Sequence, residues 1–176
     1  MSPDSPPRRA SGTIHVFTFK EGLLAGAAHD LRLRFERFTC ELDGSAVEVT
    51  IELGSLRVDG PVRAGVVRPD EYDGRRRAEI ERAAQREVLR ADRFPTAEFT
   101  AQATARAGGL DVRGTLTLAG GAASVAFPMT VAGATYQAAF ELKPSRWGIP
   151  PYSALLGTIR VQDRVRIEIV VAELTA

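Results

Sequence analysis

The chain is short of cysteine, of long apolar runs and of net charge, and each shortage excludes a class of protein. Cys40 is the only cysteine among 176 residues, so no disulfide can form within the chain, and this usage suits a reducing compartment. No stretch of about 18 consecutive apolar residues occurs, so the sequence predicts no transmembrane helix. The 23 basic and 22 acidic side chains nearly cancel, so no overall field attracts the chain to nucleic acid or to an anionic membrane.

The first eleven residues lack the apolar core of a secretory signal and are rich in proline and arginine. We therefore expect a disordered tail over residues 1–11, one domain over residues 12–176, and a soluble protein of the cytoplasm. A chain of this length buries about 70% of its unfolded surface in a single domain. The sequence leaves open whether the protein is a monomer or a homodimer.

From Gly12 onward, apolar and polar residues alternate, which is typical of strands with one buried face. Residues 31–36 and 47–53 show this alternation clearly, and Gly108-Gly109 and Gly120-Gly121 supply hairpin turns. A last hairpin is expected across residues 162–164. Successive antiparallel strands with one apolar face must stack as two sheets or close into a barrel to protect their edges.

One segment, about residues 70–91, departs from this period. Ile80, Ala84 and Val88 recur at helical spacing, so we predict a helix that lays these side chains against the strands. The candidate N-caps are Asp70 and Asp73, and the candidate i,i+4 ion pairs are Arg75 with Glu79 and Arg77 with Glu81. The basic run at residues 75–77 is either a landing patch for lipid phosphates or a solvated helix face.

Residues able to carry catalysis or bind metal are few. His15, His29 and Cys40 lack the close paired spacing of zinc sites, so we predict no metal and no cofactor. His29 has two possible roles: it ends a turn together with Asp30, or it donates a hydrogen bond to the head group of a ligand.

Three segments in a fixed order resemble the YceI-like family, which consists of lipocalin-like β-barrels whose characterised members bind polyisoprenoid lipids. They are the junction of helix and strand at residues 89–99, the strand at 112–118, and the segment 140–149; residues 17–22, 28–30 and 47–53 add to the likeness. The resemblance extends from about Gly12 to the C-terminus. It implies an all-β fold with one helix, built as an extended eight-stranded antiparallel barrel around an elongated apolar cavity.

If the strands close in this way, one apolar face of the strands becomes the inner face of the barrel. The residues predicted to line the cavity are Phe35, Val49, Ile51, Phe99, Leu116, Phe127, Met129, Phe140 and Ile167. Larger side chains could instead interdigitate and fill the barrel with a solid core. Small residues on the same face permit a cavity: Ala97, Ala101, Ala103, Ala138 and Gly114. The family resemblance favours the cavity.

The segment 145–157 is too long and too apolar for a simple hairpin loop, so we place it near the opening of the barrel. There Trp147 and Tyr152 would cap a ligand while Arg146 pairs with its head group. The alternative is that Trp147 plugs one end of the barrel.

Together these features predict a protein that is not an enzyme and that binds, carries or stores an isoprenoid or similar long apolar lipid. Two alternatives stay open. One is an enzyme or isomerase that acts on a small apolar substrate with His29 as acid and base. The other is a filled barrel that serves as a protein-interaction module through residues 75–77 and the segment around Trp147.

Overall fold

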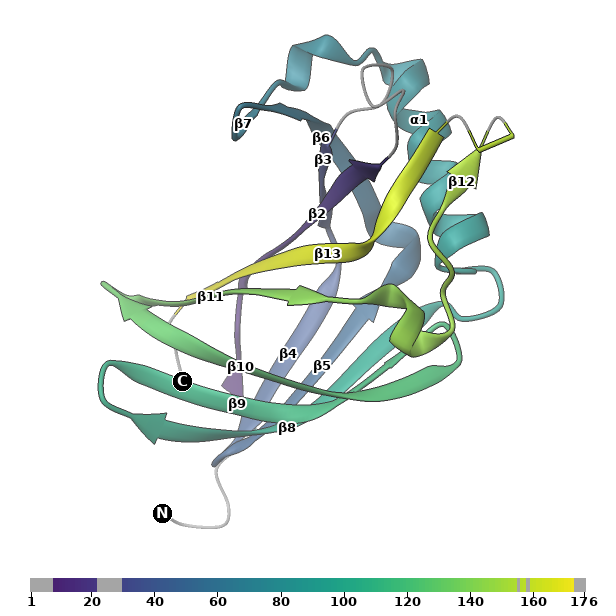
Figure 1. Ribbon diagram of the computed structural model, residues 1–176. Coiled ribbons are helices and arrows are strands. Elements are labelled where there is room, and N and C mark those ends of the chain that lie inside the picture. The colour runs from purple at the N-terminus through teal and green to yellow at the C-terminus, as the bar shows by residue number, and fades with distance from the viewer. Residues whose placement is uncertain (1–7, 22–29, 155, 158, 173–176) are drawn as a thin grey trace.

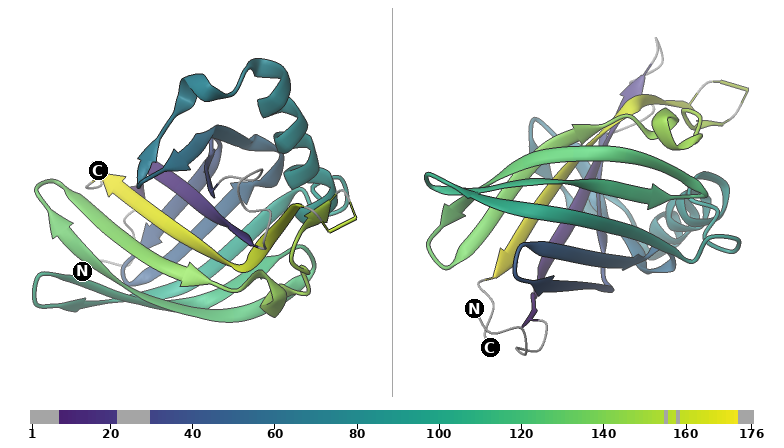
Figure 2. Two further views of the ribbon diagram at one scale, coloured as in Figure 1. Left: turned by 45° about the horizontal axis from the view of Figure 1, so that its top comes forward. Right: turned by 90° about the horizontal axis from the view of Figure 1, so that it is seen from below.

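Antiparallel strands dominate the computed structural model, which describes residues 8–21, 30–154, 156–157 and 159–172. The strands are β1 (Arg8–Arg9), β2 (Gly12–Glu21), β3 (Asp30–Phe35), β4 (Phe38–Asp43), β5 (Ala46–Glu52), β6 (Leu56–Arg63), β7 (Val66–Val67), β8 (Thr96–Arg106), β9 (Gly109–Leu118), β10 (Gly121–Ala132), β11 (Thr135–Leu142), β12 (Ser153–Ala154) and β13 (Ile159–Ala172). The sheet curls around a central space, and helix α1 (Gly74–Ala83) lies across one side of it (Figures 1 and 2). Within the described residues, no helix is both long and apolar enough to cross a bilayer.

The sheet closes into a ring because several strands are bent halves of longer segments. Counted through the bends, there are eight long segments, namely 8–21, 30–43, 46–63, 96–106, 109–118, 121–132, 135–142 and 159–172. Each segment pairs antiparallel with the next, and β13 returns to pair with β2. The first segment also reaches the second at its far end, where Arg8 lies opposite Leu42. The predicted antiparallel barrel with one helix is confirmed, although the strand count differs: several of the eight long segments are divided into shorter strands, and β7 and β12 are additional.

This closure corrects the expected extent of the N-terminal tail. Residues 8–11 belong to the barrel: β1 pairs with β4, the Ala10 N–H donates to the Cys40 carbonyl at 2.9 Å, and the Ala172 N–H donates to the Ser11 carbonyl at 2.8 Å. Backbone pairing with two partners orders this segment, although its own sequence has no apolar pattern. Residues 1–7 lie outside the described part of the chain.

The hairpin predicted across residues 162–164 is wrong, because β13 runs unbroken through them. Val161 pairs with Lys20 and Val165 pairs with Thr18, so the three residues between them bulge out opposite Phe19 alone. The bulge is held by the Gln162 side chain, which donates to the Lys20 carbonyl at 3.0 Å. A tight hairpin favours glycine or asparagine at a left-handed position, and the sequence Gln-Asp-Arg provides neither.

The helical region is shorter and less regular than the sequence predicts. A 3₁₀ turn at Pro69–Glu71 precedes α1, and a π-helical turn at Ala84–Val88 follows it. Asp73 is the N-cap, and its carboxylate accepts from the Arg76 N–H at 2.8 Å. The helix begins where the capping carboxylate satisfies one of its free N–H groups.

One of the two expected ion pairs on α1 forms. Arg75 lies 3.2 Å from Glu79, whereas the predicted pair between Arg77 and Glu81 is wrong. Arg77 donates to the Pro69 carbonyl, and Glu81 accepts from the Val58 N–H at 2.9 Å. Backbone N–H and carbonyl groups that lack a backbone partner need one from a side chain. Arg77 and Glu81 therefore bind such groups, because an exposed ion pair between them would contribute only about 0.2–0.5 kcal/mol.

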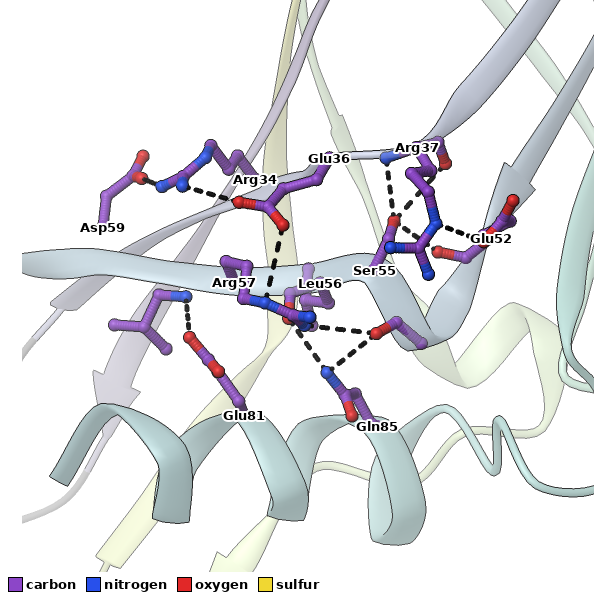
Figure 3. Close-up of polar contacts among 12 residues, drawn as sticks. Arg34, Glu36, Arg37, Glu52, Ser55, Leu56, Arg57, Asp59, Glu81 and Gln85 are labelled. Carbon is purple, nitrogen blue, oxygen red and sulfur yellow. Dashed lines mark hydrogen bonds and ion pairs between the residues drawn. The ribbon is translucent and has the colours of Figure 1, made fainter. Parts of the chain in front are cut away.

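Helix α1 covers the part of the β6 edge with which no strand of the described residues pairs (Figure 3). Beside the Glu81 contact, the Gln85 side chain donates to the carbonyls of Leu56 at 2.9 Å and Gly54 at 3.2 Å. Side chains of the helical region thus replace the strand that would otherwise satisfy this edge. As a result, α1 completes the wall of the barrel.

We expect Glu81→Ala to lower the free energy of unfolding by about 1–3 kcal/mol, because the Val58 N–H would stay buried without an acceptor. Urea denaturation of the purified variant measures this loss. Glu79→Ala is the matched control, because Glu79 lies on the same helix and makes only an exposed ion pair with Arg75. Its loss should change the free energy of unfolding by less than about 1 kcal/mol. Equal losses in the two variants would contradict the proposed edge contact.

Candidate functional site

The barrel encloses a cavity of about 1100 Å³ between the sheet and α1. This volume lies slightly above the range of roughly 300–1,000 Å³ that is typical of small-molecule sites. All nine residues of the predicted inner face line it: Phe35, Val49, Ile51, Phe99, Leu116, Phe127, Met129, Phe140 and Ile167. Their contact with a ligand stays a prediction. The helical region adds Ile80, Ala84 and Val88 to the lining, so the apolar stripe of the helix faces the same space.

Aromatic rings stack along one part of the cavity wall. Phe127 and Phe140 lie with ring centroids 4.2 Å apart and planes only 5° from parallel, and Phe99 lies 6.0 Å from Phe127. Stacked rings of this kind form a smooth apolar surface with little conformational freedom.

Small residues explain why this inner face leaves a void. Ala101 lies directly opposite Gly114, on a face whose neighbours Val112 and Leu116 point into the cavity. Gly114 is required here, because a Cβ at this position would lie 2.3 Å from the Thr100 carbonyl oxygen. Gly114 and Ala101 together place only one methyl group at this point of the inner face, which leaves room that larger side chains would take. The barrel therefore does not hold a solid core.

Charged residues lie at one end of the cavity, where β2 ends, β13 begins and α1 starts (Figure 1). The charged residues of the lining are Lys20, Arg76, Glu79, Arg160 and Asp163. None of these five residues was predicted to line the cavity. The sequence of β2 could have indicated Lys20. Every second residue of this strand faces the cavity, from Ile14 through Val16 and Thr18, and the next residue in this series is Lys20.

Of the three residues expected at the opening in segment 145–157, only Tyr152 lines the cavity. Burial is the main reason that the pKa of its phenol is raised, and the Glu87 carboxylate adds to the effect. The phenol therefore stays protonated at neutral pH and can donate a hydrogen bond.

Trp147 and Arg146 do not reach the cavity lining. The indole of Trp147 is 3% exposed, and its N–H donates to the Leu116 carbonyl at 2.7 Å. Arg146 donates to the Ser124 carbonyl at 2.9 Å and lies over the Trp147 ring. The structure thus places both side chains outside the cavity lining, and their expected roles as ligand cap and head-group contact stay predictions. A buried indole N–H needs an acceptor, and the Leu116 carbonyl provides one within the wall.

The histidines and the cysteine do not form a common site among the described residues. Cys40 lines the cavity, and burial raises the pKa of its thiol. His15 alternates with cavity-lining Ile14 and Val16, so it faces outward, 3.7 Å from Asp59. His29 lies outside the described residues. Within the part of the chain that the structure describes, no group of three or more histidine, cysteine or carboxylate side chains is placed to hold a metal ion.

On the outer face, Asp59 is almost fully buried beneath two arginines. Its carboxylate accepts from Arg32 at 2.7 Å and also from Arg34, which in turn contacts Glu36 (Figure 3). Burial and the Arg32 charge lower the pKa of the neighbouring His15, and Asp59 offsets this only in part. His15 is therefore neutral at neutral pH.

We expect the protein to lose stability as the pH falls below about 6.5, because His15 accepts a proton more readily in the unfolded chain than in the folded one. Above that pH both states are neutral at His15 and its contribution is complete. Thermal denaturation between pH 8 and pH 5 measures the slope, which His15→Gln should reduce. His29→Gln is the comparison for the other histidine, and an unchanged slope in His15→Gln would refute the assignment.

The chain is similar to a known domain family and to several solved structures. A model of the YceI-like domain matches residues 10–172. No curated protein sequence matches the chain.

Among solved structures, BcnA of Burkholderia cenocepacia is similar with a TM-score of 0.60 and 22% identity, over 94% of this chain and 96% of that one. A polyisoprenoid binding domain from Saccharophagus degradans, implicated in plant cell wall breakdown, is similar with a TM-score of 0.62 and 10% identity, over 97% of this chain and 100% of that one. The YceI protein of Campylobacter jejuni has a TM-score of 0.52 and 16% identity, over 80% and 84% of the two chains. At these identities the structural likeness concerns the fold.

Proposed function

This chain belongs to the YceI-like domain family, and on that premise we propose that it binds a long apolar lipid, an isoprenoid or a similar chain, inside its barrel. The protein would act as a carrier or store for this lipid and would not transform it. The observation that carries the proposal is the apolar cavity of about 1100 Å³ inside the barrel. The similar domain from Saccharophagus degradans, which is described as polyisoprenoid-binding, supports the choice of ligand class.

The size of the cavity suits a long chain. One water molecule, with its single heavy atom, takes roughly 30 Å³ of liquid water. If each heavy atom of a ligand takes about the same volume, the cavity holds a ligand of on the order of 35 heavy atoms. Burial of a few hundred Å² of apolar ligand surface contributes on the order of 5–10 kcal/mol at about 25 cal/mol per Å². Tight binding therefore needs no charged contact along the chain of the ligand.

The chemistry of the lining supports binding over catalysis. The Cys40 thiol is held protonated by burial, and among the described residues no histidine lines the cavity to activate it. The role of His29 as acid and base has no structural support, since that residue lies outside the described part of the chain. A reducing compartment such as the cytoplasm suits the single buried thiol.

Native mass spectrometry of the purified protein tests the proposal, followed by organic extraction and identification of any lipid released. We expect a mass increment of one lipid molecule per chain, which disappears after extraction. A protein that carries no lipid and does not take up added isoprenoid would overturn the proposal and favour a role in protein interaction.

A further inference from the structure

A second groove lies on the outer side of the helical region, apart from the barrel cavity. It has a volume of about 320 Å³. The helical region contributes Glu81, Arg82, Gln85 and Arg86 to its lining, and the corner between β5 and β6 contributes Gly54 and Arg57. None of the residues that line this groove also lines the barrel cavity. A molecule therefore reaches the groove from the solvent without entering the barrel.

Two arginines of the groove are unpaired. Among the residues that the structure describes, the side chains of Arg82 and Arg86 make no hydrogen bond and no ion pair. Two other carboxylates of the helical region do not neutralise them, because Glu79 pairs with Arg75 at 3.2 Å and Glu87 does not line the groove. Arg82 and Arg86 are four residues apart, so their like charges are neighbours on the helical surface and repel each other. An anion between them would offset this repulsion.

The acceptors of the groove are already used within the protein (Figure 3). The Glu81 carboxylate accepts from the Val58 N–H at 2.9 Å. The Gln85 side chain donates to the carbonyls of Leu56 at 2.9 Å and Gly54 at 3.2 Å. With three guanidinium groups and one engaged carboxylate, the lining has an excess of two positive charges.

The third guanidinium of the groove, that of Arg57, is held in place by the corner from which it comes (Figure 3). Its Nη1 donates to the carbonyls of Leu56 at 2.8 Å and Gly54 at 3.2 Å, and its Nε lies 3.6 Å from the Glu36 carboxylate. Within the described residues, its Nη2 has no such partner. A guanidinium that is already fixed loses little conformational freedom when it binds an anion.

We propose that this groove binds a phosphate group from outside the barrel, held by Arg82, Arg86 and the Nη2 of Arg57. The planar donors of a guanidinium match two oxygens of a phosphate. At roughly 30 Å³ per heavy atom, the groove holds on the order of ten heavy atoms, which suits a phosphate or a diphosphate and not a long lipid chain. The proposal goes beyond lipid binding and does not depend on what the barrel contains.

Titration of the purified full chain with pyrophosphate at constant ionic strength tests the proposal. In NMR spectra we expect saturable shifts of the backbone amide signals at residues 54–57 and 78–86. The double variant Arg82→Gln/Arg86→Gln should bind pyrophosphate at least about tenfold more weakly, because hydrogen bonds to charged groups are stronger than neutral ones. Arg75→Gln/Arg93→Gln is the matched control. It removes the same charge from two exposed arginines outside the groove and should bind as the wild type does.

A second ligand identifies the source of the phosphate. Vesicles of phosphatidylcholine and phosphatidic acid, sedimented with the protein, present the phosphate on a membrane surface. Sedimentation of the wild type but not of Arg82→Gln/Arg86→Gln would support the site and assign its phosphate to a membrane lipid. Binding of pyrophosphate without sedimentation would support the site and assign its phosphate to a soluble compound.

Three results would overturn the phosphate site. Neither ligand binds, or pyrophosphate shifts the signals of other residues, such as Lys20 and Arg160 in the barrel cavity, in place of those around the groove. In the third, the two double variants lose binding equally, which would show an effect of net charge alone. Circular dichroism and thermal denaturation verify that both variants are folded. The lipid content of the barrel is measured separately by extraction, so a failure of this site leaves the proposed function standing.

Discussion

Phe127→Asp is expected to yield a folded barrel that no longer retains lipid. Phe127 lines the cavity and stacks on Phe140, so a carboxylate at this position would lie on the apolar wall. In the empty cavity, which is large enough to hold water, this carboxylate stays hydrated. An apolar chain would have to displace that water, and the desolvation of an unpaired charge costs several kcal/mol. Retention should fall by at least about a thousandfold, because every 1.4 kcal/mol is a factor of ten.

Ala126→Asp is the control for this variant. Ala126 is exposed on the outer face of the same strand, so the substitution introduces the same charge one residue away. It should leave the lipid content unchanged when both proteins are extracted and compared by mass spectrometry. Phe127→Leu, which keeps the wall apolar, should also retain lipid. If folded Phe127→Asp, verified by circular dichroism and thermal denaturation, kept its lipid, the cavity would not be the binding site.

Trp147→Ala should lower the free energy of unfolding by about 3–5 kcal/mol, the range typical of large aromatic residues in a core. The indole packs in the cluster that contains Val125, Phe127 and Ile149, and its N–H satisfies the Leu116 carbonyl. Trp147→Phe preserves most of the packing and loses the hydrogen bond, so its effect should be about 1–3 kcal/mol. Denaturation in urea measures both losses.

Lipid content distinguishes the two possible roles of Trp147. The side chain does not line the cavity, so folded Trp147→Phe protein should carry as much lipid as the wild type does. Tyr152→Phe is the useful comparison, because Tyr152 does line the cavity. Loss of lipid from Trp147→Phe at unchanged stability would restore the role of Trp147 as a ligand cap.

The inner face of the barrel was predictable from the sequence because a strand alternates its side chains between two faces. Once strands are assumed, Phe99, Phe127 and Phe140 must share a face with their second neighbours along each strand. The N-cap at Asp73 was predictable for a similar reason, since the capping carboxylate acts on an N–H only three residues away. These features depend on short stretches of chain.

The wrong predictions all involve partners that are distant in sequence. The bulge at residues 162–164 depends on the register of β13 against β2, about 140 residues earlier in the chain, where Gln162 meets the Lys20 carbonyl. Glu81 bonds to Val58 in place of Arg77 because β6 has an open edge there. Local pattern contains no information on these registers.

By itself, the sequence determined the strands, the position of the single helix and which side chains face the barrel interior, because these follow from backbone periodicity and local hydrogen bonding. Only the tertiary structure decided that the ring closes where β13 pairs with β2, that the interior stays hollow, and that Lys20, Arg76 and Arg160 line one end of the cavity. Closure, packing and charge placement are determined by how segments far apart in the chain come into contact. The cavity and its charged end are therefore properties of the fold as a whole.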